Sequence, residues 1–500
     1  MKKVIRILKS IPGSKREGGA GLKEKRTSVD LYPRTYEGNP GKVTESAAKV
    51  HAHPHDPQPA AVSIPEEIWL LIFTFLQNEV SRGAQDGQLG YGMARIVSVR
   101  PLTETCRMFH RICQPLLFET IVIDGRSELS RRRAGCLLGA LENKPYLKDM
   151  VVKVRIASIF YTISEFWDRL YQTLMELRSI GDLWIREGNI SITQLSRFQE
   201  CPRLERLVLL RVDLSGSEDS TTAVFHSLKH LQCEPYGFPR PTSFFATLMM
   251  PKLETLRIDS VFLTGLERIC DHQVFQFNPA VLNDLTVETK IDWIPRMGEG
   301  LVELLKRTNQ IKSLKLPLDK LTSGFNIPDD LIPDLESFGG RADLVPAFCN
   351  GRPVRELRTY FTSSVVWELT DDVPNVIRPG SVPLEHLSID LILWEEDTMG
   401  YIARHCPELV SLKVRAKYVS GTLSTRSHMP RLRRATFLTT QGPWFKNNNN
   451  NHATKMESED GVVRGCREFW MGLEYLRLDP NYFWKYRGLE AARFEGPEVE

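Results

Sequence analysis

Several features of common functional sites are missing from this sequence. The nine cysteines include no Cys-x-x-Cys pair, which disfavours a zinc site and a disulfide framework and indicates reduced thiols. No apolar run reaches the roughly 18 residues of a membrane-spanning helix. The N-terminal stretch 1–13 is basic but has no uninterrupted apolar segment, so a secretory signal is not predicted. We therefore expect a cytoplasmic or nuclear location, or both.

Motifs for catalysis are also missing. The chain contains no Gly-rich phosphate loop, no Gly-x-Ser-x-Gly and no His-Glu-x-x-His. His405-Cys406 resembles a nucleophile pair, but Cys406 precedes Pro407 as Cys201 precedes Pro202, which indicates a recurring structural position. We predict no catalytic residue, no metal site and no cofactor, and we expect that the protein is not an enzyme.

An excess of charge of one sign is absent as well. The net charge is only +3, so neither a nucleic acid nor a membrane is expected as a partner. Residues 1–26 are the exception, with nine Lys/Arg and two acidic residues. Residues 1–60 show no sustained apolar period, and we expect a disordered basic N-terminal region.

Order is expected from Ser63 onward. Ser63-Ile-Pro-Glu66 has the spacing of a capping box, with Pro65 suited to the first helical turn. The helix that follows, to about residue 77, is apolar almost all round, so it must bury more than one face. After a polar loop at 78–95, Leu102, Cys106, Phe109 and Cys113 recur at helical spacing.

This ordered series of motifs resembles the F-box. The matching segments are Ile64-Pro65-Glu66-Glu67-Ile68, Ile72-Phe73, Leu76, Cys106-Arg107, Phe109 and Pro115-Leu116-Leu117-Phe118. The resemblance covers about 60 residues, and the loop at 78–95 is longer than usual in the family.

The resemblance implies docking onto a Skp-type adaptor and, through it, onto a cullin–RING ubiquitin ligase. The residues that it places in the adaptor contact are Ile64, Pro65, Ile68, Trp69, Ile72, Leu76, Phe109, Pro115 and Leu116.

Beyond residue 140 one pattern recurs, of the form apolar-x-x-apolar-x-apolar, often preceded by Pro. Clear instances begin at Pro202, Pro251, Pro407 and Pro430. The first apolar positions are Leu204, Leu228, Leu253, Leu282, Ile311, Leu335, Val354, Leu384, Leu409, Leu432 and Leu473. Most of the steps between them fall within the 20–29 residues of a leucine-rich repeat, and their loose spacing resembles that of fungal-type F-box proteins.

These patterns predict a mixed α/β fold, in which a short all-α F-box domain precedes an irregular leucine-rich-repeat solenoid. The last two apolar residues of each motif alternate on a strand and face inward, and no repeat buries its apolar face alone. The solenoid is expected to curve, with strands on its concave face and helices outside. The predicted boundaries are 1–60 for the basic region, 61–125 for the F-box domain, 126–485 for the solenoid with a disordered Asn-rich loop near 441–460, and 486–500 for a tail.

The residue between the two inward ones should point to the concave face. The basic members of this row are Arg257, Lys315, Arg358, Lys413 and Arg477, and we predict that they bind the target. The next outward row contains Glu234, Asp259, Glu288, Asp390 and Asp479. Two interpretations stay open: the basic row receives an acidic or phosphorylated segment, or the two rows neutralise each other, as Arg257 with Asp259 or Lys413 with Asp390 would do.

The sequence therefore favours the substrate-recognition subunit of a Skp–cullin–F-box ubiquitin ligase. In this hypothesis the F-box binds the adaptor, the repeats bind a protein target, and partner subunits carry out the ubiquitin transfer. The alternative is a non-ligase scaffold that uses the same two parts for protein–protein interaction.

Overall fold

The computed structural model describes most of the chain from Cys106 to Glu495, and Trp69 before it. The described residues are 69, 106–157, 164–215, 223–235, 248–265, 276–278, 281–288, 295–316, 327–328, 330–359, 377, 380–394, 398–419, 428–439, 463–464, 466, 470–479, 482–487 and 490–495. The chain divides into two units, Met1–Ser63 and Ile64–Glu500, and all described residues belong to the second. The predicted basic region and Asn-rich loop lie outside the described residues.

One sheet of 16 strands organises the second unit. Its strands are parallel from the first to β17, and β18 and β19 then add in antiparallel direction. In spatial order they are β1 (Thr120–Asp124), β2 (Lys153–Ala157), β3 (Asp182–Ser191), β4 (Arg206–Ser215), β6 (His230–Pro235), β8 (Thr255–Asp259), β10 (Asp284–Glu288), β11 (Ser313–Leu316), β12 (Ser337–Gly340), β13 (Glu356–Thr359), β14 (His386–Trp394), β15 (Ser411–Val419), β16 (Arg434–Thr439), β17 (Tyr475–Asp479), β18 (Tyr482–Arg487) and β19 (Glu490–Glu495).

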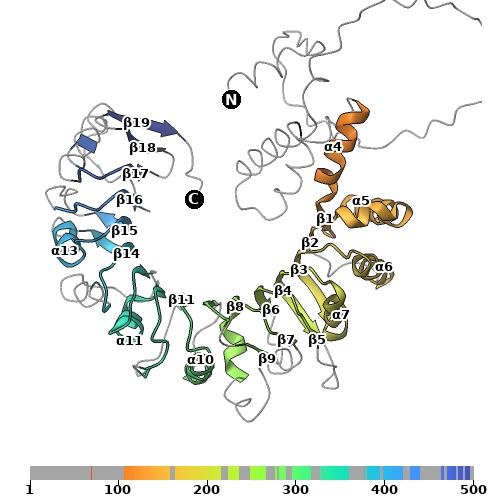
Figure 1. Ribbon diagram of the computed structural model, residues 1–500, viewed down its shortest axis with the longest axis horizontal. Coiled ribbons are helices and arrows are strands. Elements are labelled where there is room, and N and C mark those ends of the chain that lie inside the picture. Colours follow the sequence, from red (N-terminus) through yellow and green to blue (C-terminus); the bar gives the residue numbers. More distant parts are fainter. Residues whose placement is uncertain are drawn as a thin grey trace, which may run out of the picture. The chain divides into compact units, whose positions relative to one another are not determined.

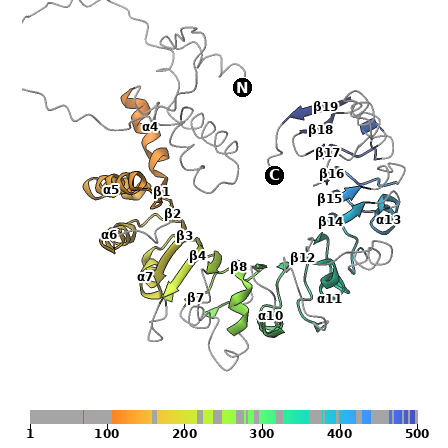
Figure 2. The ribbon, with the colours of Figure 1, turned by 180° about the vertical axis from the view of Figure 1, so that it is seen from behind.

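Helices and a small second sheet cover the outer side of this large sheet (Figures 1 and 2). The α-helices are α4 (Arg107–Phe118), α5 (Glu128–Asn143), α6 (Ser164–Met175), α7 (Ile192–Arg197), α10 (Pro295–Arg307), α11 (Val345–Cys349) and α13 (Thr398–His405). The 3-10 helices are η2 (Pro145–Met150), η3 (Phe198–Glu200), η4 (Ser260–Gly265) and η5 (Ala342–Leu344). The second sheet contains β5 (Ala223–Val224), β7 (Leu248–Met250) and β9 (Gln276–Phe277).

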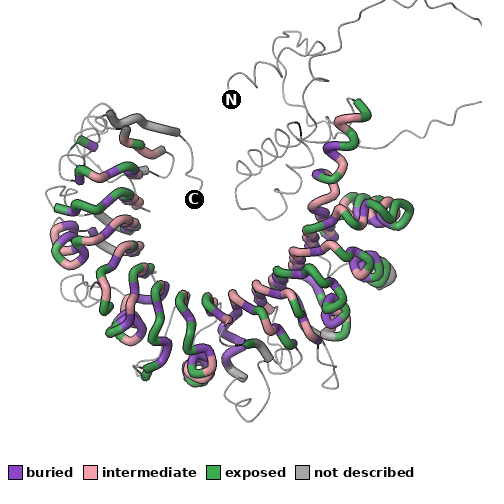
Figure 3. The backbone as a smooth tube through the Cα atoms, viewed as in Figure 1, coloured by how far each residue is buried: buried purple, intermediate pink, exposed green. Residues whose placement is uncertain are grey.

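The predicted repeat motif explains the sheet. All eleven first apolar positions, from Leu204 to Leu473, are buried, and the second ones fall in direct register, as Leu207 does with Leu231 and Leu256 with Leu285. Figure 3 shows buried residues alternating with more exposed ones along the strands. The predicted α/β fold with a long parallel repeat sheet is therefore confirmed. The all-α part of that prediction is described only at Trp69 and α4.

The sheet is longer at both ends than the predicted solenoid. β1 pairs in parallel with β2 and therefore belongs to the sheet, although the sequence assigns it to the end of the F-box segment. β19 likewise lies in the segment assigned to the tail. The C-terminal pair β18–β19 thus extends the parallel sheet in antiparallel direction.

A ladder of shared carbonyls joins the repeats at the entrance to the strands. The Glu205 carbonyl accepts from the N–H groups of Lys229 and His230, and this two-donor arrangement recurs down to the Arg433 carbonyl. The charged side chains along the same rim alternate in sign, with the uncharged Asn283 and Val410 among them. In order they are Glu205, Lys229, Glu254, Asn283, Lys312, Glu336, Arg355, Glu385, Val410, Arg433 and Glu474. Four neighbouring pairs form ion pairs: Lys229–Glu205, Lys312–Glu336, Arg355–Glu385 and Arg433–Glu474. Each exposed pair contributes little alone, but the alternation avoids like charges between adjacent repeats.

The shortest repeat step, 19 residues from Leu335 to Val354, depends on a buried arginine. Arg352 is only 2% exposed. Its guanidinium donates to the carbonyl oxygens of Leu331 at 3.0 Å, Ala347 at 2.9 Å and Pro328 at 3.1 Å. The side chain thereby satisfies three backbone carbonyl groups, one in the short helix α11 and two in the segment before β12.

Candidate functional site

The inner face of the sheet presents one continuous row of side chains. Strand pairing places these residues in direct register: Val122, Arg155, Trp184, Val208, Gln232, Arg257, Thr286, Lys315, Gly339, Arg358, Ser388, Lys413, Thr436 and Arg477. All five predicted target-binding residues lie in this row. Sequence reasoning missed Val122, Arg155 and Trp184, although Val151-x-x-Val154-x-Ile156 and Ile180-x-x-Leu183-x-Ile185 fit the repeat motif without its Pro.

Charges neutralise each other in the middle of this face. Arg257 forms an ion pair with Glu288 on the neighbouring strand, and Lys315 Nζ lies 3.7 Å from Asp284 Oδ2. Arg358 pairs with Glu356 of its own strand at 2.7 Å. Arg257 pairs with Glu288 of the next outward row in place of the expected Asp259. Lys315 and Arg358 pair instead with acidic residues at the starts of strands, two positions before the row.

The C-terminal part of the face carries more positive charge. On β15, Lys413, Arg415 and Lys417 alternate with the buried Leu412, Val414 and Ala416 and so share the inner face. Arg434, Arg477 and Lys485 follow on β16, β17 and β18. Asp390 on the adjacent strand β14 pairs with Arg415, with 3.7 Å between Asp390 Oδ2 and Arg415 Nη1.

The N-terminal part of the face holds an aromatic residue between two arginines. The guanidinium carbon of Arg155 lies 5.0 Å from the centre of the Trp184 ring, and that of Arg206 lies 5.4 Å from it. Asp182 is two residues before Trp184 on the same face. Burial raises the pKa of the Asp182 carboxyl, and the positive charges of Arg206 and Arg155 act against this rise without cancelling it.

The same two strands contain a stacked backbone irregularity. Glu187 on β3 has φ 56° and Arg211 on β4 has φ 53°, the left-handed region that L residues rarely adopt. The register around them, Arg186 with Leu210 and Gly188 with Val212, places the two residues opposite each other. Arg211 Nη1 lies 3.5 Å from Glu187 Oε1. At these residues the alternation of buried and exposed side chains shifts by one position, from Leu183 and Ile185 to Gly188 and Ile190 on β3. Both strands have ten residues in total.

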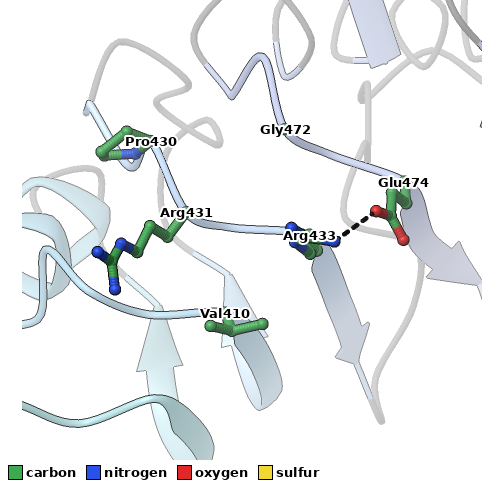
Figure 4. A pocket seen from close by; sticks show the side chains of 6 residues that line it. All are labelled: Val410, Pro430, Arg431, Arg433, Gly472 and Glu474. Carbon is green, nitrogen blue, oxygen red and sulfur yellow. Dashed lines mark hydrogen bonds and ion pairs between the residues drawn. The ribbon is translucent and has the colours of Figure 1, made fainter.

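An open hollow lies on the rim where the alternation of charge is interrupted at Val410. Figure 4 shows its lining, and Val410, Pro430, Arg431, Arg433, Gly472 and Glu474 form it. Both arginines have acidic partners, since Arg433 pairs with Glu474 at 3.1 Å and Arg431 with Glu408 at 2.8 Å. The hollow therefore adds no uncompensated charge next to the basic strands.

The described residues of the F-box-like segment form a packed start to the sheet. The rings of Trp69 and Phe109 meet edge to face with centroids 4.9 Å apart, and Trp69 is 4% exposed. Within α4, Leu116 is buried and Pro115 is exposed. Ile64, Pro65, Ile68, Ile72 and Leu76 lie outside the described residues, so the adaptor contacts stay a prediction.

The two cysteines that precede the prolines of the repeat motif, Cys201 and Cys406, are buried. Burial raises the pKa of Cys406 to about 12 and that of Cys201 to about 11, which makes the thiolate nucleophile scarce at neutral pH. Among the described residues there is no group of three or more His, Cys, Asp or Glu side chains that would hold a metal ion. No helix in that part of the chain is long and apolar enough to cross a membrane.

Similarity to known proteins is found among solved structures. No family model and no curated protein matches the chain. Among solved structures, an internalin (inlF) from Listeria monocytogenes is similar at 11% sequence identity, with 61% of this chain and 88% of that chain covered and a TM-score of 0.27. The assignment of a leucine-rich-repeat-like architecture therefore rests on this chain's own sheet register and buried repeat positions.

Proposed function

We propose that this protein is the substrate-recognition subunit of a Skp–cullin–F-box ubiquitin ligase. The F-box-like segment binds a Skp-type adaptor, and the inner face of the repeat sheet binds a target protein. The chain itself performs no chemistry. It raises the effective concentration of a target lysine near the ubiquitin-conjugating subunit.

The observation that carries the proposal is the direct connection between helix α4 and the sheet. Glu119 alone separates the end of α4 at Phe118 from the start of β1 at Thr120. Ile112, Cys113 and Leu116 of α4 are buried. A helix that carries the last F-box motif is thus fixed on the first repeat, as a subunit that holds a target at a set distance from its ligase requires.

The contact between Trp69 and Phe109 also supports the proposal. It joins the first helix of the F-box motif to its later aromatic position, across 40 residues of sequence. An unrelated pair of helices has no reason to bring these two motif positions together. Because Trp69 packs against Phe109, we assign these two residues to the packing of the F-box-like segment, together with the buried Leu116. The proposed adaptor contacts are then Ile64, Pro65, Ile68, Ile72, Leu76 and the exposed Pro115.

The test is capture of a purified Skp-type adaptor by the full-length protein. The double variant Ile68→Asp and Ile72→Asp removes apolar side chains from the proposed contact. The matched control, Leu129→Asp and Met471→Asp, makes the same chemical change at two positions that are 50% and 82% exposed elsewhere. Circular dichroism confirms that each variant is folded.

The proposal expects adaptor capture by the wild type and the control and none by the Ile68/Ile72 variant. Failure of the folded wild type to bind the adaptor contradicts it. In that case the non-ligase scaffold becomes the better account, since it uses the repeat surface without an adaptor.

A further inference from the structure

The N-terminal end of the inner face has a composition unlike the rest. We call it the tryptophan surface and define it by Arg155, Trp184, Arg186, Arg206, Val208 and Leu210. These residues lie on β2, β3 and β4, with Arg155, Trp184 and Val208 side by side in one register row.

Apolar side chains occupy its centre. Trp184 is partly exposed, Leu210 is partly exposed, and Val208 is only 1% exposed although it belongs to the solvent-facing row. From β6 onward the same row holds only polar or charged residues and glycine among its described positions. Trp184 and Leu210 therefore form a small, partly exposed apolar contact area on a face that is otherwise polar.

Four guanidinium groups surround this centre. Arg155 and Arg206 flank the Trp184 ring, and Arg186 and Arg211 lie beside Glu187 at the end of the surface. Trp and Arg are the residues most enriched in the centres of protein interfaces, because each presents a large contact area with directed polar groups. A tryptophan ringed by arginines is therefore the composition of a binding hot spot.

Backbone strain coincides with the tryptophan surface. The left-handed conformations of Glu187 and Arg211 cost on the order of 1–3 kcal/mol each, and such strain concentrates at functional sites. The strained residues direct Arg211 and Glu187 toward each other at the border of the surface. Composition and strain are independent observations that meet on β3 and β4, whereas the third described non-glycine residue with a positive φ, Ile332, lies outside any strand.

We propose that the tryptophan surface binds a segment of the target protein in which an apolar residue is flanked by acidic residues. The apolar residue packs on Trp184 and Leu210, and the flanking carboxylates receive paired hydrogen bonds from Arg155 and Arg206. This inference rests on the proposed function, because it names the kind of target that the repeat face captures.

A nucleic acid fits the tryptophan surface less well. Asp182 and Glu187 lie among the four arginines, so few positive charges are left for the continuous row of phosphates that a nucleic acid presents, whereas one or two acidic residues need only an arginine each. The partly exposed Leu210 also offers nothing to a phosphate. The surface favours a partner that combines apolar and acidic groups, which a polypeptide does.

The experiment selects peptides from a random phage-displayed library against the full-length protein. The enriched peptide is then synthesised with a fluorescent label, and its binding is measured by anisotropy with wild type, Trp184→Ser, Trp184→Phe, Arg206→Glu and Arg434→Glu. Arg434 is the matched control, because it is exposed in the same register row as Arg206 but lies on β16.

The expected enriched sequence contains an apolar residue next to Asp or Glu. Trp184→Ser and Arg206→Glu each weaken its binding about tenfold or more, as for interface hot spots. Trp184→Phe, which keeps an aromatic ring, and Arg434→Glu change it less than about threefold. Exchange of the acidic residues of the peptide for Asn and Gln also weakens binding about tenfold.

Three results overturn the inference: no enriched peptide, an enriched peptide without acidic residues, or equal binding by wild type, Trp184→Ser and Arg206→Glu. Stronger competition by single-stranded oligo-dT than by the unlabelled peptide overturns it as well. Adaptor capture by the same variants separates this outcome from the proposed function. Adaptor binding without peptide binding rejects only the tryptophan surface, and peptide binding without adaptor binding rejects only the ligase assignment.

Discussion

Two strand pairs of the sheet, β3–β4 and β14–β15, are longer than the strands between them. β3 and β4 each have ten residues and β14 and β15 each have nine, whereas the strands of the same sheet between them, β6, β8, β10, β11, β12 and β13, have four to six. The first pair contains the left-handed residues Glu187 and Arg211. No positive φ angle occurs in the second pair, whose strands are described throughout.

The side chains of the two pairs differ as much as their backbones. The first pair presents Trp184 among arginines, and the second presents Lys413, Arg415 and Lys417 along one strand. Two strand pairs of similar length therefore present different chemistry on the inner face. The first pair has the apolar centre of a specific contact, and the second has a solvated basic surface that contributes long-range attraction more than specificity.

The largest expected effect concerns the segment between the two pairs. Arg352→Met leaves three carbonyls without their guanidinium donor, and we expect the free energy of unfolding to fall by roughly 3–5 kcal/mol. Urea denaturation followed by circular dichroism measures this change. The control Arg355→Met removes an exposed ion pair with Glu385 and should cost less than about 1 kcal/mol. Equal costs for the two variants would contradict the structural role of Arg352.

Alanine substitution of two helical glycines gives the next largest effect. The free energy of unfolding should change in opposite directions in the two variants. A Cβ at Gly300 in α10 would lie within van der Waals overlap of the Leu263 carbonyl, so Gly300→Ala should destabilise by about 2–4 kcal/mol. A Cβ at Gly135 in α5 meets no atom within 4 Å, so Gly135→Ala should stabilise by about 0.5–1 kcal/mol. Thermal unfolding of both variants tests this, and stabilisation by Gly300→Ala would show that α10 is not packed against η4.

The backbone difference between the two strand pairs predicts a smaller effect. Arg211→Gly relieves a left-handed conformation and should raise the free energy of unfolding by about 0.5–1 kcal/mol. Arg415→Gly, at an extended position of β15, should lower it by about 1 kcal/mol. The same sign for both substitutions in urea denaturation would remove the distinction between the pairs.

The smallest expected effect is the pH dependence of the contribution that Asp182 makes to folding stability. Burial raises its folded pKa above the unfolded value, so the folded state binds the proton more tightly and ionised Asp182 reduces stability above that pKa. Asp182→Asn should therefore be slightly more stable than wild type at neutral pH, and the difference should shrink as the pH falls through the folded pKa. If thermal unfolding shows that the stability difference between Asp182→Asn and wild type grows as the pH falls, the folded-state pKa of Asp182 is lowered and not raised.

The sequence predicted the repeats because their apolar positions are periodic and local. Leu204 and the ten later first positions are buried as predicted. The repeats that begin at Val151 and Ile180 were missed because neither has the Pro that precedes the clearer copies. Contacts between residues of different repeats could not be predicted from a local sequence pattern. Arg352, with its three carbonyl acceptors, and the ion pair of Arg257 with Glu288 depend on the register between distant segments.

The candidate site was predicted only in part for the same reason. The row of inner residues follows from period-two alternation, so Arg257, Lys315 and Arg358 were placed correctly on the face. Which of them are neutralised depends on neighbouring strands. The prominence of Trp184 depends on Arg155 and Arg206, which are 29 and 22 residues away in sequence and meet it only through the sheet.

The most direct test of the whole account is a comparison of protein half-lives in cells. Three versions of the full-length protein are expressed in cells that lack the endogenous protein. They are the wild type, the adaptor-contact variant Ile68→Asp with Ile72→Asp, and Trp184→Ser. Proteins captured by each version are identified, and their half-lives are measured by pulse-labelling mass spectrometry. The account predicts captured proteins that are short-lived with wild type, bound but long-lived with the adaptor-contact variant, and neither bound nor shortened with Trp184→Ser. Equal half-lives with wild type and the adaptor-contact variant would contradict the ligase function.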